Sequence, residues 1–131
     1  MNSVIKLSFG QVLLLGKSLA EVVIDEGVEV NKRMIHNLHL ALATHLKAPF
    51  RVLLNKENSY SFSYEAQRAF GNMSQFQSIA MLAKTSSGEL SAKVKSQVSE
   101  SCAEFGIFKS RSLALNWLQR DYPYTGTAIA S

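Results

Sequence analysis

The sequence predicts a single α/β domain with a mixed, mostly parallel β-sheet of about five strands flanked by about four helices. Its 131 residues are the size of one compact domain. Its composition, 47% hydrophobic and 18% charged, is typical of a globular chain. After an opening group of short strands, helical and strand-like patterns alternate, and parallel neighbouring strands need helical crossovers. We expect the domain to span residues 1–121, with 122–131 as a loose tail.

The first part of the chain predicts three short strands and one helix. Residues 4–8, 11–15 and 19–25 are rich in β-branched and aliphatic residues and are separated by glycine-containing turns, which indicates an opening meander. Asn31 is a good N-cap residue. Apolar residues then recur at helical spacing until Pro49, which predicts one amphipathic helix.

The second part predicts three strands that alternate with helices. The strands are expected at residues 50–54, 76–84 and 104–108. Ser63 can cap a helix that runs through Phe70 and stops at Gly71. A helix over residues 87–102 has only a thin apolar stripe, made of Leu90, Val94, Val98 and Cys102. A closing helix that starts near Ser110 is expected to bury Leu113, Ala114, Trp117 and Leu118.

Charge and cysteine content narrow the classes of function. The formal net charge of +4 is modest, and the basic residues are scattered without interleaved aromatic residues, so we expect no nucleic-acid partner. Cys102 is the single cysteine, which excludes an internal disulfide. The apolar run at residues 12–15 is too short to span a bilayer. We therefore expect a soluble, cytoplasmic protein without a transmembrane segment.

Four patterns resemble catalytic or binding motifs, and for each we favour a structural role. The triplet at residues 16–18, Gly-Lys-Ser, lacks the first glycine of a phosphate-binding loop. His36 and His39 have a metal-compatible spacing but no acidic neighbour on that helix face. The acidic group at residues 25–29 is best explained as a solvated turn, and Cys102 as a core residue. We predict no catalytic residue, no metal site and no cofactor, and hence no enzyme.

Three segments resemble the SpoIIAA-like proteins of the STAS superfamily. They are Ile-Asp-Glu-Gly-Val-Glu-Val at residues 24–30, Val-Leu-Leu-Asn at 52–55, and Phe-Lys-Ser-Arg-Ser-Leu-Ala-Leu-Asn-Trp-Leu at 108–118. The last is the most specific, and the likeness in element order covers about residues 4–118. The resemblance implies a small α/β domain related to anti-sigma-factor antagonists. Those proteins bind a partner kinase and are switched by serine phosphorylation in a loop after the third strand.

The corresponding loop here supplies the candidate interaction and phosphorylation residues. They are Asn58, Ser59, Tyr60, Ser61, Phe62 and Ser63. The antagonists have Asp-Ser followed by a small residue and Gly, a pattern that this loop lacks. A phosphate on Ser61 or Ser63 would gain from the helix amides but would lie near Glu65. We favour the alternative that the serine is a helix cap.

Two hypotheses of function remain. The first is an interaction module that binds a protein partner through the loop at residues 55–63 and the adjacent helix starts, with Tyr60, Phe62 and Tyr64 exposed as its anchors. Burial of these aromatic residues would remove the anchors. The alternative is a carrier of a small apolar, lipid-like ligand held under the 87–102 helix by Leu90, Val94 and Val98. Leu40, on the polar side of the first helix, hints at a homodimer contact.

Overall fold

The computed structural model describes residues 3–55, 60–71, 75–82 and 104–120 and contains two sheets and three helices in those ranges. The main sheet has six strands, in the order β1 (Ser3–Leu7), β2 (Gly10–Leu14), β3 (Leu19–Ile24), β5 (Phe50–Asn55), β7 (Phe76–Leu82) and β8 (Glu104–Phe108). A small second sheet pairs β4 (Glu29–Val30) with β6 (Ser61–Phe62). The helices are α1 (Lys32–His45), α2 (Tyr64–Gly71) and α4 (Arg111–Leu118).

The predicted mixed sheet is confirmed, with a larger number of strands. β1, β2 and β3 form an antiparallel meander, and β3, β5, β7 and β8 then pair in parallel. The main sheet has six strands rather than about five because all three opening segments join it. The pairing of β4 with β6 was not predicted, since two-residue strands carry no readable periodicity. The helix predicted over residues 87–102 and the tail lie outside the described residues.

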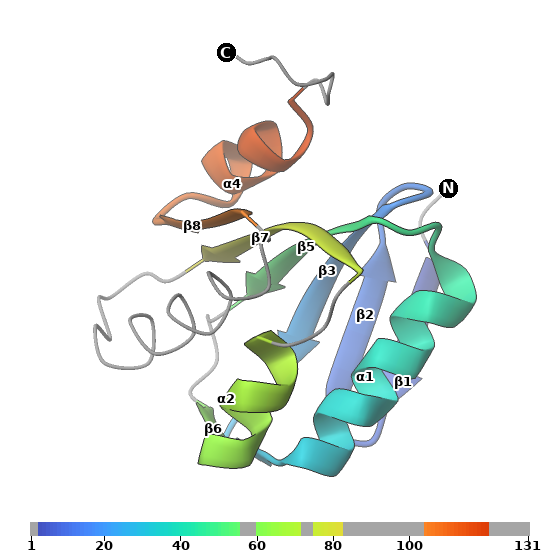
Figure 1. Ribbon diagram of the computed structural model, residues 1–131. Coiled ribbons are helices and arrows are strands. Elements are labelled where there is room, and N and C mark those ends of the chain that lie inside the picture. The colour runs from blue at the N-terminus through green and yellow to red at the C-terminus, as the bar shows by residue number, and fades with distance from the viewer. Residues whose placement is uncertain (1–2, 56–59, 72–74, 83–103, 121–131) are drawn as a thin grey trace.

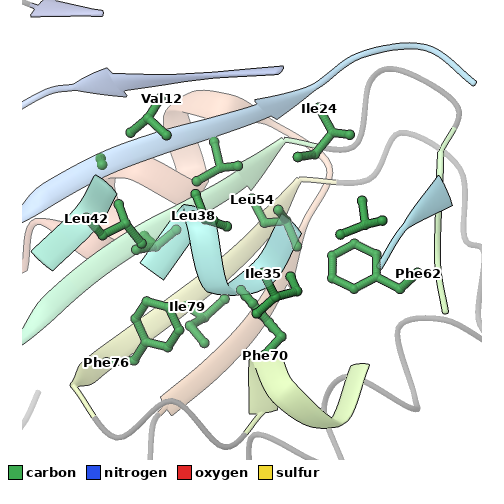
Figure 2. Close-up of a cluster of buried hydrophobic side chains, with 14 of the residues drawn as sticks. Val12, Ile24, Ile35, Leu38, Leu42, Leu54, Phe62, Phe70, Phe76 and Ile79 are labelled. Carbon is green, nitrogen blue, oxygen red and sulfur yellow. The ribbon is translucent and has the colours of Figure 1, made fainter. Parts of the chain in front are cut away.

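Helices cover the main sheet from both sides. Figure 1 shows α1 and α2 side by side on one face and α4 on the opposite face. Alternate residues of a strand point to opposite faces, so Val52 and Leu54 of β5 belong to the larger core whereas Leu53 belongs to the core under α4. Figure 2 shows how α1, α2 and the strands converge on the larger core.

Local signals set the ends of α1 as predicted. The Asn31 side chain accepts a hydrogen bond from the Met34 amide at 2.9 Å, which satisfies one of the free donors of the first turn. At the other end, the Leu46 amide donates to the Leu42 carbonyl oxygen at 2.8 Å, shortly before Pro49. Leu40 points away from the sheet and is 52% exposed.

The apolar face predicted for the closing helix needs a correction. Ala114 and Leu118, four residues apart, are fully buried, as expected. Leu113 is instead 58% exposed. Trp117 is half-buried and its ring centroid lies 5.4 Å from that of Phe108. An eight-residue helix lying on one side of the sheet buries a narrower stripe than the run of apolar residues suggests.

Candidate functional site

The loop that follows β5 leads into what we call the β6–α2 corner, residues 60–68. β6 lies parallel to β4, with Val30 opposite Phe62. The Ser61 amide donates to the Val28 carbonyl oxygen at 3.1 Å, and the Ser63 amide donates to that of Val30 at 2.9 Å. The corner is therefore held by backbone hydrogen bonds to the segment that leads into α1.

Tyr60 and Phe62 are buried, each 7% exposed, so the prediction that they are exposed anchors is wrong. Because strand residues alternate in direction, Ser61 points to solvent while both rings point inward. The Tyr60 hydroxyl donates to the Asn55 carbonyl oxygen at 3.0 Å, and burial raises the pKa of this phenol. The Phe62 ring packs edge-on against Phe70 at 5.9 Å. These two aromatic residues attach the corner to the core.

Ser63 is the N-cap of α2, as we favoured from the sequence. Its Oγ accepts a hydrogen bond from the Ala66 amide at 3.0 Å, and its carbonyl oxygen accepts one from the Gln67 amide at 3.0 Å. Ser61 is exposed. Phosphorylation of either serine stays a prediction. Asn58 and Ser59 of the candidate loop lie outside the described residues.

We expect the Ser63→Ala variant to lose about 1 kcal/mol of unfolding free energy, because one amide of the first turn of α2 loses its acceptor. Urea denaturation followed by circular dichroism measures this loss. The matched control is Ser61→Ala, which removes an exposed hydroxyl two residues earlier and should stay within about 0.5 kcal/mol of the wild type. Equal losses in the two variants would contradict the assignment of Ser63 as the cap.

Tyr64 is the most exposed large hydrophobic residue of the described chain, at 67%. It occupies the first position of α2, and Arg68, one turn later, places its guanidinium carbon 5.9 Å from the centre of the tyrosine ring. This distance is within the range of a cation–π contact, and both side chains lie on the solvent side of the helix. Of the three aromatic residues proposed as anchors, the structure therefore leaves Tyr64 at the surface.

A buried polar network connects the corner to α4. Asn55, whose carbonyl oxygen binds Tyr60, donates its side-chain amide to Glu21 Oε2 at 2.8 Å. Glu21 Oε1 accepts from Arg111 Nε at 3.0 Å and from Arg111 Nη2 at 2.7 Å. Glu21 is only 3% exposed although it is charged. The network therefore joins β3, β5 and α4.

This network was not predicted from the sequence. The available signal is the single acidic residue inside the apolar run of residues 19–24, since a carboxylate is rarely buried without a partner. Both oxygens of Glu21 are hydrogen-bonded, one of them to Arg111. The arrangement stabilises the charged carboxylate between two elements rather than offering it to a substrate, so we assign it a structural role.

The other sequence candidates do not assemble into a chemical site. His36 is exposed, whereas His39 Nε2 lies 2.7 Å from Gln75 Oε1. Asp25, Glu26 and Glu29 are exposed, as predicted for a solvated turn. Within the described ranges, no three His, Cys, Asp or Glu side chains are placed to hold a metal ion together.

The Gly-Lys-Ser triplet at residues 16–18 links β2 to β3, as expected of a chance match to a phosphate-binding loop. The Ser18 hydroxyl donates to the Lys47 carbonyl oxygen at 2.7 Å, which ties this turn to the end of α1. Cys102 and the candidate lid residues Leu90, Val94 and Val98 lie outside the described residues. None of the helices in the described ranges combines the length and apolar character needed to cross a membrane.

Comparison with known proteins assigns the fold. A solved structure of an uncharacterized protein of the DUF3478 family from Shewanella loihica PV-4, with a SpoIIAA-like fold, superposes with a TM-score of 0.50 and 14% sequence identity. The alignment covers 90% of this chain and 92% of that one. The chain has a SpoIIAA-like fold. No family model and no curated protein matches the sequence. The SpoIIAA-like fold agrees with the resemblance seen in the sequence, and a fold does not by itself define a function.

Proposed function

We propose that this SpoIIAA-like domain is a non-enzymatic interaction module that binds a protein partner through the exposed side of the β6–α2 corner. The observation that carries the proposal is the exposure of Tyr64 at the start of α2, with Arg68 over its ring. Tyrosine and arginine are enriched at the centres of protein interfaces. An aromatic ring held at the surface by its own helix is suited to such a contact.

The corner is preorganised for binding. Buried Tyr60 and Phe62, the Ser63 cap and the pairing with β4 all hold its backbone in place. Binding to a surface that is already ordered costs less conformational entropy than binding to a loop that must first fold. The buried aromatic residues therefore support the proposal in a different way from the one the sequence suggested, because they position Tyr64 rather than contact the partner.

The corner carries exposed charges of both signs, because the exposed Glu29 of β4 lies opposite Ser61 while basic residues occupy the adjoining helices. α1 and α2 each begin two residues after a paired position, Val30 in β4 and Phe62 in β6, so the two helix starts lie side by side. Exposed basic residues outnumber acidic ones on these two helices. They are Lys32, Arg33 and Arg68, against Glu65. Helix N-termini add partial positive charge of their own.

The test is a comparison of immobilised wild-type protein with the Tyr64→Ala and Leu113→Ala variants for capture of proteins from the source cells. Leu113 is a matched control because it is also exposed, at 58%, but lies on α4. We expect one partner to bind the wild type and Leu113→Ala. The Tyr64→Ala variant should bind the purified partner roughly 30-fold more weakly, the loss typical of an interface hot spot.

The same titration should show weaker binding at higher salt, because charged surfaces are screened. Equal binding of the partner by all three proteins would contradict the proposed site. Loss of binding in Leu113→Ala alone would place the interface on α4.

A further inference from the structure

In the described ranges, the edge strand β1 has few of the usual protections against pairing with another chain. In the part of the chain that the structure describes, it pairs with β2 alone, at the end of the sheet opposite β8. Its sequence, Ser-Val-Ile-Lys-Leu, contains no proline, and its register with β2 continues without a bulge from Ser3 to Leu7. Edge strands are normally protected by proline, bulges, charges or a covering segment. Lys6 is the single charge of β1.

The register of the β1–β2 hairpin determines which backbone groups of β1 point outward. Leu7 lies opposite Gly10 across a loop of only two residues, so this closing pair must exchange both backbone hydrogen bonds. Hydrogen-bonded pairs then alternate along the strand, which directs the amides and carbonyls of Ser3, Ile5 and Leu7 toward β2. The amides and carbonyls of Val4 and Lys6 point away from β2.

From this geometry we propose that two copies of the chain form a dimer by antiparallel pairing of their β1 strands about a two-fold axis at Ile5. Val4 of each copy then lies opposite Lys6 of the other copy, and both residues have outward backbone groups. Each such pair can exchange two N–H···O bonds, so the axis generates four bonds between the copies. The two six-stranded sheets become one continuous sheet.

The side chains favour this register over its neighbours. Val4, 48% exposed, would be covered by the aliphatic stem of Lys6 of the second copy. Ile5, which packs against the larger core, would meet Ile5 of the second copy and extend that core across the interface. An axis at Lys6 would place two lysines opposite each other, and an axis at Val4 would place Ile5 opposite Ser3 instead of a second Ile5.

The hairpin register also indicates a substitution that weakens the pairing between copies without weakening the β1–β2 hairpin. The Lys6 amide points away from β2, so Lys6→Pro removes two of the four bonds between the copies, one from each copy, and leaves the β1–β2 bonds intact. Val4→Lys places two lysines opposite each other at each end of the pairing. Leu40→Ala is the control for a dimer formed instead through the exposed leucine of α1.

Sedimentation equilibrium of the full chain, across a concentration series, measures the dimer. We expect a dimeric wild type and an unchanged Leu40→Ala, with the dissociation constant raised about tenfold or more in both Lys6→Pro and Val4→Lys. Circular dichroism checks that each variant is folded. A wild type that stays monomeric up to about 1 mM would overturn the proposal. So would a dimer that both β1 variants leave intact, or one that Leu40→Ala alone dissociates.

Amide hydrogen exchange of the wild type tests the register without any substitution. The Val4 and Lys6 amides should exchange slowly at high protein concentration and rapidly after dilution, since only the second copy protects them. The Ile5 amide should be slow at both concentrations because β2 protects it in each state. Rapid exchange at Val4 and Lys6 throughout, in a dimeric sample, would overturn the pairing of β1 with β1.

Discussion

Replacing Arg111 by alanine should lower the free energy of unfolding by roughly 3 kcal/mol, which is near the lower end of the cost of breaking a buried ion pair. The reason is that the Glu21 side chain, 4% exposed, loses both of its contacts from Arg111. We choose the lower end because the Arg111 side chain is 49% exposed, so water can partly reach its position. Urea denaturation followed by circular dichroism measures the loss.

Two comparisons separate this effect from a general loss of surface charge. Lys109→Ala removes an exposed cation two residues earlier and should change the stability by less than about 0.5 kcal/mol. The double variant Glu21→Gln with Arg111→Leu removes both charges and keeps a side-chain oxygen for the Asn55 amide. It should recover part of the loss of Arg111→Ala, because no buried charge is left unpaired. A Lys109→Ala loss as large as that of Arg111→Ala would contradict the role assigned to the pair.

Phe70→Ala should lower the free energy of unfolding by about 3–5 kcal/mol, the usual cost of emptying a buried phenylalanine site. The ring is 1% exposed. It lies 5.9 Å from Phe62 and 5.5 Å from Phe76, measured between ring centroids, and thereby joins α2 to β6 and β7 (Figure 2). Chemical denaturation of the purified variant measures the change.

The control for Phe70→Ala lies in the same helix. Tyr64→Ala also truncates an aromatic residue of α2, but the exposed ring contributes little to folding, so its effect should stay within about 0.5 kcal/mol. The same measurement supports the test of partner binding. If Tyr64→Ala binds the partner more weakly but is as stable as the wild type, the lost binding comes from a lost surface contact and not from unfolding. Similar destabilisation by the two substitutions would show that α2 is packed differently.

The SpoIIAA-like fold was largely predictable because its signals are local. Apolar runs of a few residues identified every strand of the main sheet. The three residues predicted to begin helices each accept a hydrogen bond from an amide in the first turn of that helix; they are Asn31, Ser63 and Ser110. These features depend on residues within three or four positions of each other. The alternation of helix and strand was then sufficient to predict a largely parallel sheet.

The candidate site was predictable in position but not in orientation. The sequence located the loop after β5, yet Tyr60 and Phe62 turned out to be buried and Tyr64 exposed. Which side of β6 faces the core depends on its pairing with β4, and that pairing joins residues 32 positions apart in a sheet of two residues per strand. A period of two residues cannot be recognised in so short a segment.

By itself, the sequence determined the order and type of the main elements and the residues that cap the helices. Only the tertiary structure decided which distant groups meet. Glu21 is paired with Arg111, 90 residues later in the chain, because the parallel sheet brings β3 under the start of α4. Local patterns report the intrinsic preference of a segment, whereas the partner of a buried charge depends on packing between segments, and no local pattern encodes that packing.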